Sequence, residues 1–258
     1  MTINKNLKKG ITVCLICHNE EYWLWFTLPD MVKYSDKVVI IDGSPFGPSD
    51  DNSEKIIRSI IRPTDVYIRG KFGCERNENN KNWNIVMRNE YLKYVDTTHM
   101  LLVDADEAYL PEDWQKFRNY INKRIAGLRY PYIHFYMDTN HILKGHPVWD
   151  SLCHHFTIYR PGFKYTILDT KIKDDRGLAL VGRPEMITDN SIRLFHYNRL
   201  SPSDVYKMKQ AKFKKRFDGG GLSDEEYDVW FKNWKDDRAL DYKYIRPWSG
   251  KHPLEGKI

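Results

Sequence analysis

The chain has no hydrophobic stretch long enough to cross a membrane. None of its apolar runs approaches the roughly 20 residues that a membrane-spanning helix requires. The basic start MTINKNLKKG is not followed by the apolar core of a secretory signal peptide. We therefore expect a cytoplasmic protein, and peripheral attachment to a membrane stays open.

Cysteine is scarce, with 4 residues in a chain of 258. Cys14 and Cys17 form a CxxC pair, but no second pair completes a zinc site. Both lie in the apolar run ITVCLIC, where a spacing of three places the two side chains on opposite faces of a strand. We therefore expect buried thiols without a disulfide, in a reducing compartment.

Neither sign of charge dominates the composition. Lys and Arg number 41 against 35 Asp and Glu, for a formal net charge of +6. This excess suits an anionic ligand or an anionic surface but does not demand nucleic acid. Internal repeats and low-complexity linkers are also lacking. With 41% hydrophobic residues, the chain can bury one core of ordinary domain size.

Short apolar runs alternate with helical patterns in the first part of the chain. The runs over 11–17, 37–41, 65–68 and 100–103 predict buried strands. Helical periodicity follows each of the first three runs, and Ser53 is the predicted cap of one of these helices. Strands that alternate with helices predict an α/β fold, with a mostly parallel sheet and helices on both faces.

The pattern changes after residue 127. Extended runs such as LRYPYIHFYM and IRLFHY predict a smaller half of mixed or antiparallel β structure. From residue 201 onward, two helical patterns rich in basic and aromatic residues follow. We therefore divide the chain into a domain over 1–200, with halves 1–110 and 111–200, and a helical C-terminal extension over 201–258.

Three carboxylates directly follow the apolar run over 100–103. Asp104 and Asp106 are predicted to leave the strand on the same side, and Glu107 comes next. A divalent cation such as Mn²⁺ or Mg²⁺ would relieve their repulsion, because these ions prefer oxygen ligands. Ligands of open α/β sheets bind outside the carboxyl ends of the strands. A solvated turn is the alternative interpretation.

Four motifs follow one another in a recognisable order: VCLICHNEE, VVIIDGS, the helical Arg88-Asn89 pair and LLVDADE. In this order they resemble GT-A-fold glycosyltransferases, family-2-like, which transfer a sugar from a nucleotide-sugar donor. The resemblance covers residues 11–110 and reaches weakly to about residue 206. It implies a Rossmann-like GT-A domain whose first half binds the donor and whose second half binds the acceptor. The longer, Pro-rich loop after Ser44 departs from the family pattern.

The resemblance implies roles for several residues of the donor half. Asn19 and Glu20 match the motif that lines the nucleotide pocket, and Asp42 matches the acid that contacts the nucleobase or ribose. Arg88 and Asn89 match the helical pair near the diphosphate. Each has a structural alternative: a helix cap for the first pair, a turn for the aspartate, and a helix-surface charge for the arginine.

The resemblance also implies a metal site. Asp104 and Asp106 match the two acids of the DxD motif; the second ligates the metal, and the first approaches the ribose or a metal-bound water. His196 matches a histidine that closes the metal or diphosphate site in many enzymes of this fold. Because His196 lies between Phe195 and Tyr197, a packed and hydrogen-bonded side chain is its alternative.

An inverting mechanism needs a general base that takes the proton of the acceptor hydroxyl. The resemblance implies an acid in the second half of the chain, and the candidates are Asp150, Asp169, Asp174, Asp175 and Glu185. Two adjacent acids can have separated pKa values, which suits one of them to proton transfer. We favour Asp175 and an inverting reaction, with a solvated loop as the alternative.

The sequence thus predicts a metal-dependent glycosyltransferase that acts on a glycan, a lipid-linked acceptor or another hydroxyl. The basic helix expected over 202–217 suits contact with an anionic membrane, or else it packs as an ordinary amphipathic helix. Two other functions stay open: a glycosyltransferase that acts on nucleic acid, and a non-enzymatic module that binds anionic ligands. A nucleotidyltransferase is disfavoured, because HNEE stands where a Gly-rich loop would be expected.

Overall fold

The computed structural model describes residues 6–73, 83–123, 125, 127–136, 138–145, 152–159, 164–167, 178–180, 186–197 and 244–257. None of the helices in this part of the chain has the length and apolar character needed to traverse a bilayer.

The chain is divided into two compact units. The first consists of Met1–Tyr132, Ser151–Phe195 and His252–Ile258. The second consists of Ile133–Asp150 and His196–Lys251. Each unit is described separately below.

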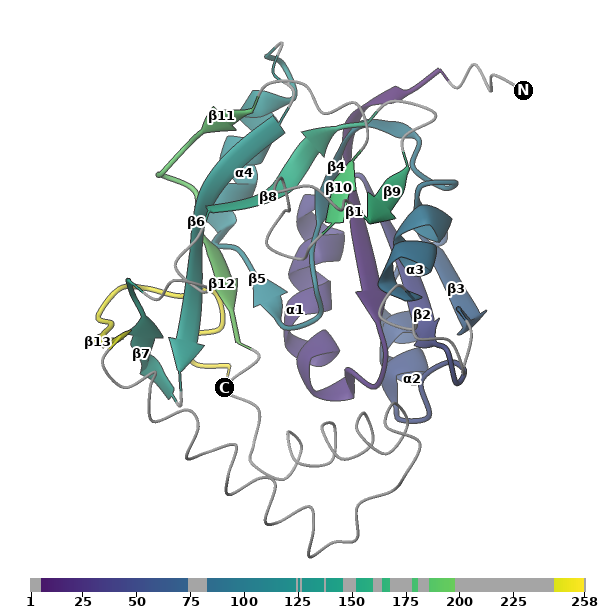
Figure 1. Ribbon diagram of the computed structural model, residues 1–258, viewed down its shortest axis with the longest axis horizontal. Coiled ribbons are helices and arrows are strands. Elements are labelled where there is room, and N and C mark those ends of the chain that lie inside the picture. Colours follow the sequence, from purple (N-terminus) through teal and green to yellow (C-terminus); the bar gives the residue numbers. More distant parts are fainter. Residues whose placement is uncertain are drawn as a thin grey trace, which may run out of the picture. The chain divides into compact units, whose positions relative to one another are not determined.

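Four parallel strands form the centre of the first unit. The strand β1 (Lys8–Cys17) pairs with β2 (Lys37–Ser44) on one side and with β4 (Thr97–Leu102) on the other. The strand β3 (Val66–Lys71) pairs with β2, so the order is β4-β1-β2-β3 (Figure 1). These strands are the four that the apolar runs predict. Because they are parallel, their carboxyl ends meet at one edge of the sheet.

Helices connect these strands or follow them. The first, α1 (Glu21–Tyr34), contains Pro29, and the second is α2 (Ser53–Ile60). The third is α3 (Trp83–Tyr91), and α4 (Pro111–Tyr120) has proline in its first turn. A proline is tolerated there because the first amides of a helix have no partner within it.

One face of the sheet packs against α4. The register places Val13, Leu101 and Phe156 side by side across three strands. The ring of Phe117 in α4 stacks on Phe156, with ring centroids 5.0 Å apart. The apolar side chains on this face therefore form a core with α4.

The opposite face packs against α3. Cys14 and Val39 are register partners, and they share a buried cluster with Met87 and Tyr91 of α3. Alternate residues of β1 thus face different helices, which explains why the run ITVCLIC is apolar throughout. Helices on both faces confirm the predicted α/β class.

The later strands form the predicted mixed half. The strand β8 (Leu152–Ile158) is antiparallel to both β4 and β6 (Gly127–Tyr136). The other strands in this part of the chain are short: β5 (Glu107–Ala108), β9 (Tyr165–Ile167), β10 (Leu178–Leu180), β11 (Ile187–Thr188) and β12 (Leu194–His196).

The second unit contains the end of β6, β7 (Asp138–Leu143) and β13 (Ile245–Pro247). The strand β7 is antiparallel to both of its neighbours. The strand β13 was not predicted, because three residues are too few to show a periodic pattern and the strand depends on pairing with β7. The helices expected over 201–243 lie outside the described residues.

Candidate functional site

Asp42 lies fully buried near the carboxyl end of β2. Its Oδ1 accepts hydrogen bonds from the backbone N–H of Ser49 at 2.9 Å and from the Ser49 hydroxyl at 2.5 Å. Its Oδ2 accepts a hydrogen bond from the Tyr67 hydroxyl at 2.7 Å and lies 3.5 Å from Nε of Arg69. Burial, aided by Asp42, raises the pKa of Tyr67, so the phenol stays protonated and donates. These partners compensate the buried carboxylate and hold the loop after β2.

Asn19 joins the loop after β1 to the loop after β2. Its backbone N–H donates to the Ser49 hydroxyl at 2.8 Å, and its side-chain Oδ1 accepts from the backbone N–H of Asp50 at 2.9 Å. Its φ is +57°, a left-handed conformation that asparagine tolerates better than most residues. Ser49 therefore links Asn19 to Asp42. Sequence analysis did not single out Ser49, because nothing distinguishes it from the other turn-forming residues of its loop.

The first amides of α1 also find partners in the loop after β2. The backbone N–H of Glu20 donates to the Ser53 hydroxyl at 3.0 Å, and that of Glu21 donates to Asp51 at 3.1 Å. The prediction that Ser53 caps its own helix is wrong: the cap position of α2 is Asn52, and no side-chain cap bond forms there. The Ser53 hydroxyl serves α1 instead, because the two loops lie against each other.

Arg88 and Asn89 lie on α3, as predicted. Arg88 is 3% exposed, so it is no ordinary surface charge, and its Nη2 lies 3.6 Å from Oδ1 of Asp104. Asn89 makes two hydrogen bonds with the backbone of Tyr165, one to its carbonyl at 3.0 Å and one from its N–H at 2.8 Å. The arginine thus places a buried positive charge beside the acids after β4, and the asparagine anchors β9.

Asp104 and Asp106 lie in a turn, because β4 ends at Leu102. Strand alternation therefore does not govern their side chains, contrary to the prediction. The side chain of Asp104 is 34% exposed, whereas Asp106 is 9% exposed. The hydroxyl of Thr27 in α1 donates to the carbonyl of Ala105 at 2.7 Å. This bond ties the turn to the first helix.

Glu107 closes this turn from within the protein. It is fully buried, and its Oε2 accepts a hydrogen bond from the backbone N–H of Asp104 at 2.8 Å. Its Oε1 accepts a hydrogen bond from the Tyr132 hydroxyl, and Nδ1 of His155 lies 3.7 Å from Oε2. No role was predicted for Glu107, although its position directly after Asp106 was a visible signal.

His196 lies in the second unit, buried beside another histidine. Its Nδ1 lies 2.7 Å from Nδ1 of His134, and the two rings meet edge to face. At this distance one Nδ1 carries the proton and the other accepts it. Packing beside a polar partner, the alternative stated for His196, is therefore present, and its role as a metal ligand stays a prediction.

The candidates for the general base lie outside the described residues: Asp150, Asp169, Asp174, Asp175 and Glu185. The CxxC pair is described. Cys14 and Cys17 are both buried and form no disulfide, as predicted. Burial raises the pKa of the Cys14 thiol, so it stays protonated and unreactive.

The acids after β4 provide only part of a ligand shell for a divalent ion. Among the described residues, no three His, Cys, Asp or Glu side chains surround one possible ion position. Mg²⁺ typically uses one or two protein carboxylates and completes its shell with water and substrate phosphate oxygens. Asp104 and Asp106 would supply the two protein carboxylates of such a site. The nearby Arg88 carries a fixed positive charge, as the ion does.

The sequence match agrees with this arrangement. A family model described as glycosyl transferase family 2 matches residues 12–177, which include the loop after β1, Asp42, Arg88 and the turn after β4. The chain belongs to glycosyl transferase family 2. The resemblance to GT-A-fold, family-2-like enzymes is thereby confirmed.

Several solved structures are similar to this family-2 glycosyltransferase. TarS residues 1–349 from S. aureus are 15% identical, over 84% of this chain and 68% of that chain, with a TM-score of 0.45. The UDP complex of the same fragment is 13% identical over 96% and 75%, with a TM-score of 0.46. The inositol-1-phosphate CTP transferase from T. maritima is 8% identical over 82% and 98%, with a TM-score of 0.41. The comparison with curated proteins finds no match.

Proposed function

We propose that this family-2 glycosyltransferase transfers a sugar from a nucleotide-sugar donor to a hydroxyl group of a glycan or lipid-linked acceptor. The observation that carries the proposal is the buried Arg88 beside Asp104, at the carboxyl end of β4. A cation and two carboxylates at this edge suit a diphosphate and a divalent ion. Parallel sheets commonly bind their ligands at this edge.

The loops after β1 and β2 form the proposed nucleotide pocket. Asn19 and Glu20 hold these loops together through their bonds to Ser49 and Ser53. Asp42 is fully buried, so we assign it to shaping the loop that faces the base or ribose. A preorganised pocket lowers the entropic cost of binding a flexible nucleotide.

The reaction replaces one bond at the anomeric carbon with another. The acceptor oxygen bonds to this carbon as the bond to the diphosphate breaks, and the hydroxyl proton passes to a carboxylate base. Arg88 provides a fixed positive charge for the leaving diphosphate, and its burial strengthens that interaction. Asp104 and Asp106 would hold Mn²⁺ or Mg²⁺, which neutralises diphosphate charge when bound.

We also propose a stereochemical course for the reaction and a general base. We favour inversion with Asp175 as the base, and Asp174 and Asp150 as the other candidates. His196 is proposed to close the metal or diphosphate site. We further propose that the enzyme is cytoplasmic and that residues 202–217 contact the membrane. Such contact would bring the enzyme to a lipid-linked acceptor.

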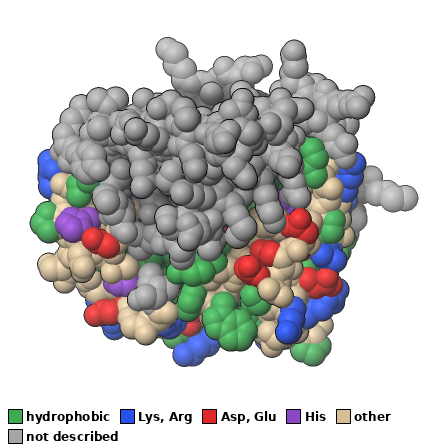
Figure 2. Space-filling view, turned by 90° about the horizontal axis from the view of Figure 1, so that it is seen from below, with side chains coloured by type: hydrophobic (Ala, Val, Ile, Leu, Met, Phe, Trp, Pro, Cys, Tyr) green, Lys and Arg blue, Asp and Glu red, His purple; other side chains and the backbone are tan. Residues whose placement is uncertain are grey.

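Glycosyl transfer to nucleic acid is the second candidate function. A protein that binds nucleic acid usually presents a clustered basic surface. On the face shown in Figure 2, acidic and basic side chains of the described residues are interspersed. The described part of this face therefore carries no single basic patch.

Thermal unfolding with a panel of nucleotides tests the proposal. UDP, GDP, CDP and their sugar derivatives are each added with and without Mn²⁺. We expect one nucleotide family to raise the melting temperature only with Mn²⁺, because a ligand that binds the folded state stabilises it. Asp106→Asn should remove this shift, whereas Asp138→Asn, an exposed aspartate of β7, should keep it. A panel in which no nucleotide shifts the wild type would contradict the proposal.

A further inference from the structure

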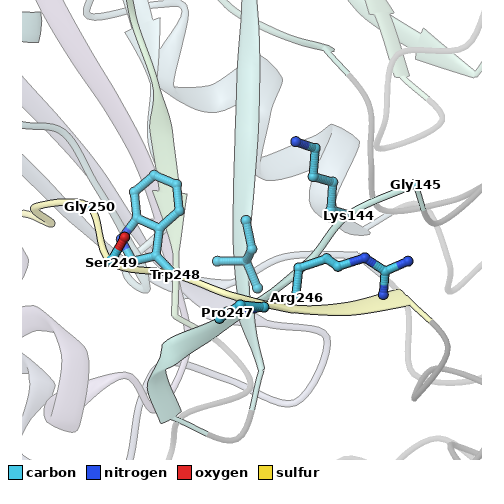
Figure 3. A pocket seen from close by; sticks show the side chains of 8 residues that line it. Lys144, Gly145, Arg246, Pro247, Trp248, Ser249 and Gly250 are labelled. Carbon is cyan, nitrogen blue, oxygen red and sulfur yellow. The ribbon is translucent and has the colours of Figure 1, made fainter.

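A pocket of about 750 Å³ lies on the ribbon that β7 and β13 form in the second unit (Figure 3). Arg246 pairs directly with Ile142 in this ribbon, so their side chains share one face. Side chains two residues apart in a strand share a face, which adds Lys144 and Trp248 to the same side. Backbone bonds from Lys144 to Tyr244 and from Trp248 to Asn140 continue this register at both ends.

The four side chains form an ordered row. Lys144 stands at one end and Trp248 at the other, about 13 Å apart along the ribbon if each residue advances about 3.3 Å. Ile142 and Arg246 lie between them. The pocket volume falls in the range of about 300–1,000 Å³ that is usual for small-molecule sites.

The indole of Trp248 is held in place. A Cβ at Gly250 would lie 2.6 Å from its Cζ2 atom, so the backbone of residue 250 packs directly on the ring. The ring of Phe135 on β6 meets the indole edge to face at 6.3 Å. The absence of a side chain at residue 250 thus allows close backbone contact and leaves the indole partly exposed in the pocket.

The charged residues that line the pocket are both cationic. Lys144 and Arg246 are both exposed, and no carboxylate is among the described residues that line it. Figure 3 shows the two cationic side chains on the same side of the pocket, away from the indole. A ligand with a flat apolar face and an anionic group a few ångströms away would complement both parts.

We propose that this pocket binds an anionic carbohydrate. The C–H face of a sugar ring packs on the indole of Trp248, whose π face is negative and attracts the sugar hydrogens. A phosphate or carboxylate on the same or the next sugar binds Arg246 and Lys144 by charge-assisted hydrogen bonds. The choice of a carbohydrate rests on the proposed glycosyl transfer, and the pocket then defines an acceptor class of charged glycans.

Calorimetric titration of the full chain tests this binding site. The probes are glucose 6-phosphate, glucuronate, glucose, inorganic phosphate and UDP. We expect one charged sugar to bind at least about tenfold more tightly than glucose or phosphate, because it alone satisfies both the indole and the cations. The better of the two charged sugars identifies the anion as phosphate or carboxylate. This affinity should fall as salt rises.

Variants locate the binding. Trp248→Ala should abolish charged-sugar binding, and Arg246→Ala and Lys144→Ala should each weaken it about tenfold. Because the two cationic side chains are exposed, their variants test the pocket even if Trp248→Ala fails to fold. The matched controls Trp25→Ala and Lys9→Ala remove an exposed indole and an exposed ammonium elsewhere, and should leave affinity unchanged.

Four results would overturn the assignment. Three of them are no charged-sugar binding tighter than about 10 mM, equal binding of glucose, and binding that survives the Arg246 and Lys144 variants. Competition by UDP would also overturn it, because the site would then be a nucleotide site. Sugar binding by a protein that binds none of UDP, GDP and CDP in Mn²⁺ would instead contradict the proposed function and leave the pocket standing.

Discussion

The carboxylate of Glu107 accepts a hydrogen bond from the backbone N–H of Asp104 at 2.8 Å. The backbone N–H of Glu107 in turn donates to the carbonyl of Asp104 at 3.1 Å. Glu107 therefore fixes the backbone of the turn that carries Asp104 and Asp106. The Tyr132 hydroxyl donates to the other carboxylate oxygen of Glu107, and Nδ1 of His155 lies 3.7 Å from Oε2, so the turn is supported by a polar network.

Replacing Glu107 with Gln should loosen this turn. The amide keeps one acceptor oxygen but loses the negative charge beside His155, so we expect the free energy of unfolding to fall by about 1–3 kcal/mol. Nucleotide affinity in Mn²⁺ should fall as well, because Asp104 and Asp106 lose their support. Urea unfolding and nucleotide titration measure the two effects. Glu112→Gln, an exposed change in α4, should alter stability by less than about 0.5 kcal/mol.

Ser49→Ala should uncouple the loops after β1 and β2. It removes the hydroxyl that donates to buried Asp42 and accepts from the N–H of Asn19. We expect a loss of about 1–3 kcal/mol in unfolding free energy and faster amide exchange at Asn19. Ser59→Ala removes an exposed hydroxyl from α2 and is the matched control. Equal effects of the two changes would argue against the link through Ser49.

Glycines 43 and 70 are register partners in β2 and β3 and should respond differently to alanine. A Cβ at Gly43 would collide with the backbone oxygen of Gly70, whereas a Cβ at Gly70 would meet only Phe72, at 3.7 Å. Gly43→Ala should therefore cost more than about 3 kcal/mol or prevent folding. Gly70→Ala should change stability by less than about 1 kcal/mol. Thermal unfolding of both variants checks the contrast, and similar melting temperatures would contradict it.

His99 should make the protein sensitive to acid. Burial lowers its pKa to about 4, and its ring stacks on Phe156. In the unfolded chain a histidine has a pKa of about 6.5, so between these values the unfolded state binds more protons. The contribution of neutral His99 to the free energy of unfolding is complete above pH 6.5. As the pH falls towards 4, up to about 3 kcal/mol of this free energy is lost. Urea unfolding at several pH values gives the free energy of unfolding as a function of pH. Between pH 4 and 6.5 this free energy should depend less steeply on pH in His99→Phe than in the wild type. An unchanged pH dependence would contradict this explanation.

Local sequence patterns were enough to predict the strands of the parallel sheet. Continuous apolar runs such as ITVCLIC can be buried on both faces only between two layers of helices, so β1, β2 and β4 were predictable. Local chemistry also sufficed for α4, which begins at Pro111. The positions of Asp104 and Asp106 after β4 followed from the same apolar run.

Which polar groups meet depends on the packing of segments that are distant in the sequence. Ser49 and Asn19 are 30 residues apart, and His134 and His196 are 62 apart. Such pairs form only after strand register has brought distant loops together, and no local periodicity encodes them. The strand β13 likewise exists only because β7 pairs with it. Composition and spacing report what one segment can become, whereas these contacts depend on how separate segments pack.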